Sequence, residues 1–280
     1  MIKQLFSAMA SSLRILFRNW RALIILVLLD VAMIGAGYRF FATREATISQ
    51  LILTLLLALL ASALFFLVQA MALELKTPNQ RLLVLLRGSL SSFWKLVVIS
   101  LPVIVVAVLA AYVLGRIEVV GVDQAVNGAL PRPGTQKPAP PLEWDAVALR
   151  TFRYVLFVVV FPLAAIHLWM AAERDGLKRA FKLSAQTLAR AFAPQAVVTY
   201  ATGFALFALV PYLLIVTKTS ATSAWLDVGL LAARLALAVA FSLLGWVGTL
   251  GALGALAAEG GKESVAQPSA GAGHVPAEAG

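Results

Sequence analysis

The sequence contains no cysteine and only two histidines, His167 and His274, among its 280 residues. A chain without cysteine forms no disulfide, offers no thiolate ligand to a metal and has no cysteine nucleophile. Zinc sites in proteins need three or four protein ligands, and the second histidine falls in a Gly/Ala-rich tail. The sequence therefore predicts no metal site.

Charge is also scarce, because Asp, Glu, Lys and Arg make up 13% of the chain, against about 25% in soluble domains. Hydrophobic residues make up 61%, and the mean hydropathy is +0.90. A soluble fold of this length would leave large apolar patches in water, and disorder requires low hydrophobicity. Both classes are excluded, and an integral membrane protein remains.

Six apolar segments are each long enough to cross a hydrocarbon core of about 30 Å, which takes about 20 helical residues. They cover residues 22–41, 48–73, 93–115, 151–171, 191–217 and 226–257. The segments are continuous, whereas the strands of a membrane β-barrel alternate in polarity. The sequence predicts an all-α integral membrane protein with one membrane domain over residues 1–258. The first apolar run reaches residue 41, so we expect an uncleaved span rather than a signal peptide.

Proline marks the longest predicted connection, an outer loop over residues 116–150 that contains Pro131, Pro133, Pro138, Pro140 and Pro141. Proline lacks the amide hydrogen that a helix interior needs. The last segment, 259–280, is rich in Gly, Ala, Ser and Pro, and we predict a disordered cytoplasmic tail.

The net charge of +10 would indicate nucleic acid binding in a soluble protein. In a membrane protein, excess Lys and Arg instead flank the spans on the cytoplasmic side. With the N-terminus inside, 14 basic residues lie inside and 8 outside. The pattern predicts a bacterial-type inner membrane protein with both termini in the cytoplasm, and no nucleic acid partner.

The inner segment before each odd-numbered span is amphipathic and basic, and an anchor pair recurs there: Leu16 and Trp20, Leu90 and Trp94, Leu188 and Phe192. We interpret the chain as three pseudo-repeats, each with an interfacial helix, a span, a turn and a second span. The alternative is that any basic amphipathic linker aligns with any other.

Basic residues of two of these segments are the predicted lipid-facing set: Arg14, Arg18, Arg21, Arg174, Lys178 and Lys182. The last three are spaced i, i+4, i+8 and would form one stripe on a helix. Such a stripe attracts anionic lipids of the inner leaflet, at about 1 kcal/mol per basic residue. The alternative is that these residues only set the orientation in the membrane.

A motif over residues 173–184 follows the fourth span: an acidic pair, a glycine, an alanine–aromatic–basic step and a serine. Residues 173–217, which contain it, resemble bacterial YciC-like membrane proteins and the membrane domain fused to some glycerophosphodiester phosphodiesterases. The resemblance implies an all-α membrane bundle of unassigned function. The sequence includes no phosphodiesterase catalytic domain, so neither that activity nor any site residue is carried over.

Asp30 and Arg234 are the two charged residues in the interior of the predicted spans, each about eight residues from a span end. At a rise of 1.5 Å per residue, both lie near mid-membrane. Charges at that depth are usually paired or functional. We predict that the two residues face each other, either as an ion pair that docks the first span on the last or as a polar site for transport. Arg234 alternatively extends toward the outer interface.

Gly245, Gly248, Gly251 and Gly254 recur every three residues in the last span. Small residues allow membrane helices to approach closely, so we predict a helix-packing face rather than a gate.

Nucleophile elbows, phosphate-binding loops, HExxH motifs and paired catalytic carboxylates are all missing from the sequence. We therefore expect a protein without enzymatic activity or cofactor. The predicted function is an accessory or organising protein that binds lipid or partner membrane proteins. The alternative is a small-solute or ion transporter with a site near Asp30 and Arg234.

Overall fold

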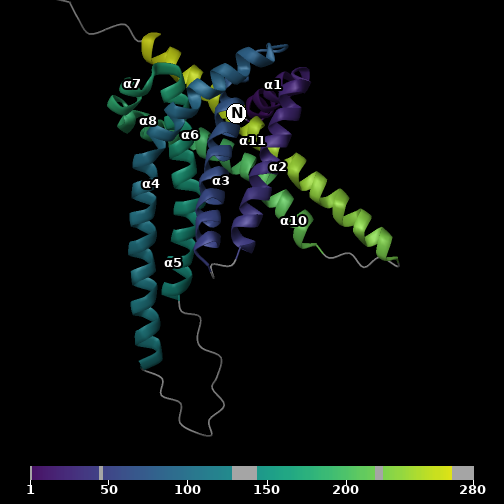
Figure 1. The fold of residues 1–280 in the computed structure, drawn as a ribbon. Helices are drawn as coiled ribbons and strands as arrows, with labels where there is room; N and C mark the ends of the chain where they lie inside the picture. The colour runs from purple at the N-terminus through teal and green to yellow at the C-terminus, as the bar shows by residue number, and fades with distance from the viewer. Residues whose placement is uncertain (1, 44–46, 128–143, 218–222, 267–280) are drawn as a thin grey trace, which may run out of the picture.

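The computed structural model describes residues 2–43, 47–127, 144–217 and 223–266 (Figure 1). In these ranges the regular structure is entirely helical. The helices are α1 (Ile2–Arg18), α2 (Trp20–Ala42), α3 (Ile48–Glu74), α4 (Leu82–Asn127), α5 (Trp144–Val155), η1 (Leu156–Val160), α6 (Phe161–Asp175), α7 (Leu177–Lys182), α8 (Ser184–Ala191), α9 (Pro194–Phe204), η2 (Ala205–Leu209), α10 (Val210–Val216) and α11 (Ala224–Ala266).

Six helical segments are long and apolar enough to cross a membrane, which confirms the predicted class and number of spans. They are Trp20–Ala42, Ile48–Glu74, Leu82–Ile117, Val147–Asp175, Pro194–Val216 and Trp225–Ala258. Their side chains point largely outward: Leu55, Val108 and Leu231 are each more than half exposed. In lipid this exposure costs nothing, because the hydrocarbon tails are as apolar as leucine. The chain is a polytopic membrane protein.

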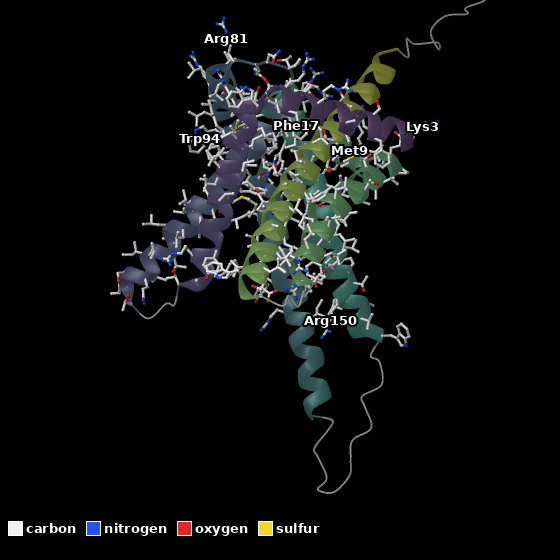
Figure 2. The ribbon with its side chains drawn as sticks, turned by 90° about the vertical axis from the view of Figure 1, so that its right-hand side faces the viewer. Lys3, Met9, Phe17, Arg81, Trp94 and Arg150 are labelled. Atoms are coloured by element: carbon white, nitrogen blue, oxygen red, sulfur yellow. The ribbon has the colours of Figure 1, made fainter. Side chains whose placement is uncertain are left out.

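The helices gather most closely at one end of the bundle (Figure 1). We call this the α1 end, and it contains α1, residues 75–81, α7 and α8. Helix α3 packs between α2 and α4, and α4 packs against α6. Helix α11 crosses the bundle obliquely and contacts α1, α9, η2 and α10. Figure 2 shows Lys3, Phe17, Arg81 and Trp94 at the α1 end and Arg150 toward the opposite end.

The hydrophobic core lies mainly near the α1 end. Helix α3 buries residues of its last turns, among them Val68 and Met71, and α11 buries residues from its second half, such as Leu253. Leu16 of α1 and Ile166 of α6 are fully buried in the same cluster. The opposite halves of the spans leave their apolar side chains to the lipid.

The three predicted interfacial helices differ from one another in the structure. The first is a separate helix, α1, which ends before Asn19. The second is continuous with its span in α4, because nothing between Leu82 and Pro102 interrupts the helix. The third is divided into α7 and α8, and Gly176, at a φ of 80°, separates α7 from α6. The threefold repeat therefore stays a prediction.

Helices extend into the ranges predicted for the outer loop and for the tail. Helix α4 continues to Asn127 and α5 begins at Trp144, both inside the range 116–150. The prolines that indicated the loop all fall in residues 128–143, which lie outside the described residues, and residues 103–127 contain no proline that would end α4. Helix α11 likewise runs to Ala266 rather than 257, and the rest of the predicted tail, 267–280, also lies outside the described residues.

Proline interrupts the fourth span without leaving its backbone unpaired. Pro162 has no amide hydrogen to donate to the carbonyl of Val158, four residues earlier. The Tyr200 hydroxyl of α9 donates to this carbonyl at 2.8 Å, and residues around it form the π-helical turn η1. Since no water is available in hydrocarbon, this bond replaces the missing one and joins the fourth span to the fifth.

The four glycines predicted to pack α11 against other helices lie next to three different elements. A Cβ atom at Gly245 would lie 2.9 Å from the backbone nitrogen of Phe207 in η2, and one at Gly251 would overlap the Ser12 side chain of α1. A Cβ atom at Gly254, in contrast, would lie 3.8 Å from its nearest neighbour, the sulfur of Met170. The four glycines therefore differ in how much space they leave.

We expect Gly245→Ala to lower the free energy of unfolding by about 2 kcal/mol, because the added methyl group meets rigid backbone. Gly254→Ala is the matched control in the same helix and should be neutral or slightly stabilising, since alanine favours helix and the nearest neighbour leaves room for the methyl group. Reversible unfolding in mixed SDS and detergent micelles measures both. Equal destabilisation by the two variants would contradict the close contact at Gly245.

Candidate functional site

The α1 end presents basic and aromatic side chains around the junction of α1 and α2. Arg14, Arg18 and Arg21 are all exposed, and their predicted contact with anionic lipid stays a prediction. Phe17 and Trp20 are each more than half exposed beside them. The Arg21 guanidinium lies 5.5 Å from the centre of the Trp20 ring, in a cation–π contact.

The predicted basic stripe of Arg174, Lys178 and Lys182 is not one helical face. Arg174 belongs to α6, and the two lysines belong to α7 beyond the break at Gly176. The Arg174 side chain bonds both carboxylate oxygens of Asp175 and donates to the carbonyl of Ala257 at 3.3 Å. Lys178 and Lys182 are exposed. The spacing i, i+4, i+8 forms a stripe only on one continuous helix, and Gly176 ends α6 before the two lysines.

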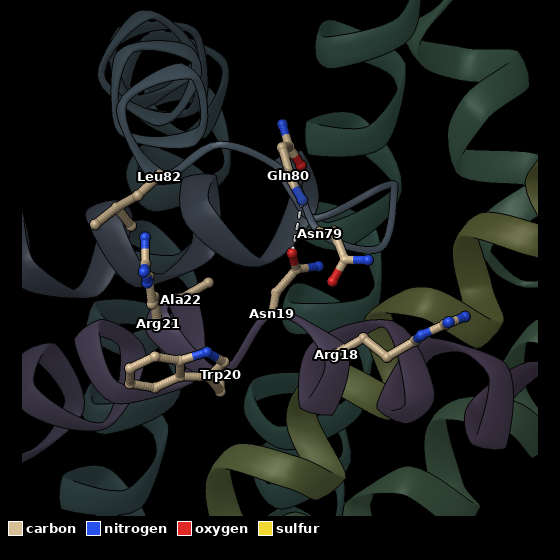
Figure 3. A pocket seen from close by; sticks show the side chains of 8 residues that line it. All are labelled: Arg18, Asn19, Trp20, Arg21, Ala22, Asn79, Gln80 and Leu82. Carbon is tan, nitrogen blue, oxygen red and sulfur yellow. Dashed lines mark hydrogen bonds between the residues drawn. The ribbon is translucent and has the colours of Figure 1, made fainter.

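Asn19, between α1 and α2, fastens the linker between α3 and α4 to this junction. It is buried, and its side-chain nitrogen donates to the carbonyls of Ile15 at 3.0 Å and Thr77 at 2.8 Å. Its side-chain oxygen accepts a hydrogen bond from the Gln80 backbone amide at 2.8 Å. Figure 3 shows this last bond. One side-chain amide thus bonds both a carbonyl and an N–H group of a loop that lies 58 to 61 residues away in the chain.

A cavity of about 230 Å³ surrounds this fastening point (Figure 3). The guanidinium groups of Arg18 and Arg21 lie on opposite sides of Asn19. The side-chain oxygen of Gln80 is buried there without a hydrogen-bond partner. The cavity therefore combines two cations with a polar wall. Its full lining is Arg18, Asn19, Trp20, Arg21, Ala22, Asn79, Gln80 and Leu82.

A second cluster of polar side chains joins three spans near the α1 end. Ser92 of α4 places its hydroxyl oxygen 2.8 Å from Oε1 of Glu74 in α3 and 2.6 Å from Oε2 of Glu173 in α6. Lys76 and Lys95 lie 3.4 and 3.5 Å from the Glu173 carboxylate. A hydroxyl has only one hydrogen to donate, so the two carboxylates share it or one of them is protonated.

Sequence reasoning missed Asn19, Glu74 and Glu173 as site residues. A signal for the two acids was present, because each ends the second span of a predicted repeat after a short Ala-rich stretch, and Glu259 stands in the same position of the third. The side chain of Glu259 lies outside the described residues. No comparable signal marked Asn19, whose partners are backbone atoms of a distant loop.

The structure does not bring Asp30 and Arg234 together. Asp30 is 7% exposed, and its Oδ2 atom has no hydrogen-bond partner. Arg234 is half-buried, and among the described residues no ion pair joins it to Asp30. A role for either residue in transport stays a prediction, whereas the predicted contact between them is not formed.

Within the described part of the chain, no group of three or more His, Asp or Glu side chains could hold a metal ion. Comparison with protein families, with curated proteins and with solved structures finds no match to this chain.

We expect Asn19→Ala to lower the free energy of unfolding by about 2 kcal/mol, because the Thr77 carbonyl and the Gln80 amide lose their partner. Gln80→Ala is the control: its backbone amide still bonds Asn19, so the loss should stay below about 0.5 kcal/mol. Unfolding in mixed micelles measures both. The proposed fastening is wrong if Gln80→Ala is as destabilising as Asn19→Ala.

Proposed function

We propose that this polytopic membrane protein is a non-enzymatic accessory protein of a bacterial-type inner membrane that binds anionic lipid at its α1 end. Bound there, it organises lipids or partner membrane proteins. The N-terminus and the C-terminus lie in the cytoplasm in this proposal. The cations of α1 then face the leaflet that carries anionic headgroups.

The observation that carries the proposal is the combination of exposed arginines and exposed aromatic rings at the α1 end. Arg14, Arg18 and Arg21 are exposed on a helix and junction that bury Met9 and Leu16 in the bundle. Aromatic rings favour the headgroup level of a membrane, and arginine forms strong bonds with phosphate. This pairing of groups is what an anionic lipid surface requires.

The resemblance of residues 173–217 to YciC-like membrane proteins supports the same assignment. It implies a membrane bundle rather than an enzyme, and the chain offers no set of residues with catalytic spacing. The exposed apolar halves of the spans also give lipid or a partner protein a large surface to cover.

We expect protein purified in lipid nanodiscs to be enriched in phosphatidylglycerol over phosphatidylethanolamine. Changing Arg14, Arg18 and Arg21 together to Gln should lower that enrichment at least about twofold, since each cation contributes about 1 kcal/mol near an anionic surface. Mass spectrometry of the lipids in the purified nanodiscs measures the ratio.

The matched control changes Arg39, Arg116 and Arg150 to Gln. These residues carry the same charge and are also exposed, but they lie outside the α1 end. Enrichment should persist in this control. An equal loss in both triple variants would mean that net charge rather than the α1 end recruits anionic lipid, and the proposal would fail.

A second candidate function is ion transport, which the state of Asp30 favours. Asp30 is buried inside a span and one of its carboxylate oxygens has no partner. Burying such a group in the membrane is costly, and residues of this kind usually have a function. None of the three cavities described here is lined by Asp30 or Arg234.

If Asp30 carries protons, proteoliposomes of the wild-type protein should dissipate an imposed pH gradient, as reported by an enclosed pH-sensitive dye. Asp30→Asn should reduce the rate to that of empty liposomes, because the amide does not titrate. Thr54→Val serves as the control, since the Thr54 hydroxyl is buried but bonds only within its own helix, at the Gln50 carbonyl. A wild-type rate no faster than that of empty liposomes excludes this function.

A further inference from the structure

We propose that a second cavity at the α1 end, of about 180 Å³, is a binding site for the phosphate group of an anionic phospholipid. The cavity lies between α6, α8, α9 and α11, away from the α1–α2 junction. This assignment rests on the proposed function and adds a discrete site and the chemical group that the site binds. Its lining is His167, Met170, Ala171, Arg174, Thr187, Arg190, Ala193, Gln195, Ala196, Leu256 and Ala257.

His167 provides the innermost polar group of this cavity. The side chain is 7% exposed, and Nδ1 lies 2.9 Å from the Leu163 carbonyl oxygen. A carbonyl oxygen only accepts hydrogen bonds, so Nδ1 carries the hydrogen. Nε2 is left without a partner among the described residues. A buried imidazole therefore offers one nitrogen to the cavity, and this nitrogen donates to a phosphate oxygen when the ring is protonated.

Two arginines line the same cavity in different states. Arg174 is held in place by Asp175 and by the Ala257 carbonyl, and this leaves part of its guanidinium N–H set free. Asp175 offsets part of its charge. Arg190, in the last turn of α8, is exposed, and its guanidinium group has no partner among the described residues. One fixed and one free guanidinium suit a doubly contacted anion, because arginine binds phosphate through paired N–H groups.

The start of α9 adds backbone donors to the cavity. Ala193 precedes the helix and accepts the first intrahelical bond from Val197. The backbone amides of Gln195 and Ala196 therefore have no acceptor within the helix. Helix N-termini carry a partial positive charge and bind anions. Together with His167 and the arginines, these amides make the cavity a donor-rich site that runs from the exposed Arg190 to a buried imidazole.

An adjoining cavity indicates that the phosphate belongs to a lipid. This third cavity has a volume of about 460 Å³ and shares Met170, Arg174 and Ala257 with the phosphate site. Ser12, Lys76, Glu173 and Arg174 are its polar groups, and the rest of its walls are apolar side chains and glycines of α1, α3, α6, α11 and the loop after α3, such as Val247 and Leu250. Arg174 thus stands between a donor-rich space and an apolar one, which matches a headgroup next to a hydrocarbon chain.

The test uses delipidated full-length protein in a neutral detergent and dioctanoyl phosphatidylglycerol as the probe, with native mass spectrometry as the measurement of Kd. Arg190→Gln should weaken binding about tenfold, as expected for the loss of one charge-assisted hydrogen bond. Arg179→Gln is the matched control, because Arg179 is an exposed arginine of α7 that lines none of the three cavities. Its Kd should equal that of the wild type.

Two further measurements separate the outcomes. Inorganic phosphate should compete with the lipid only weakly; competition as strong as that of the lipid itself would overturn the assignment to a phospholipid. Equal Kd values for Arg190→Gln and Arg179→Gln would overturn the site. Thermal unfolding without lipid checks that both variants fold. The nanodisc enrichment that depends on Arg14, Arg18 and Arg21 is measured independently, so failure of this site and failure of the proposed function are distinguishable.

Discussion

The absence of water along six spans is the constraint on which this structure depends, because a polar group in hydrocarbon has to find its partner within the protein. The Tyr200 hydroxyl fills the place of the amide hydrogen that Pro162 lacks. Trp169 of α6 donates its indole hydrogen to the Ser100 hydroxyl of α4 at 2.7 Å. Each of these bonds connects two spans. Because polar groups in hydrocarbon need partners within the protein, these bonds also help to specify which helices pack together.

The same requirement explains why the polar groups gather at the α1 end. Asn19, Ser92 and Glu173 are buried or nearly buried there, and each has partners from a different helix or loop. Water and lipid headgroups meet the protein at this depth, so charged side chains remain solvated on one side and bonded on the other. A protein built this way concentrates its polar contacts at one end and leaves the opposite halves of its spans for contact with hydrocarbon.

The spans were predictable from the sequence because their apolar runs are long and local. The pairing of helices was not, since the contacts of Asn19 and Glu173 join residues far apart in the chain. The stripe through Arg174 failed because Gly176 ends α6, and the outer loop was predicted to begin too early because α4 continues to Asn127. The glycine spacing in α11 indicated a packing face, but only the structure shows that Gly245 meets backbone while Gly254 does not.

The 46 residues of α4 form a continuous helix of about 69 Å, more than twice the thickness of the hydrocarbon core. Its first residue, Leu82, follows directly on the loop that Asn19 holds. A rotation of 1° at that fixed point moves the far end by about 1.2 Å, from the rise per residue alone. Helix α4 is also held at Ser92 and Ser100 by bonds to α3 and α6, so a change of its tilt near the loop carries these two helices with it and becomes an ångström-scale displacement at its far end.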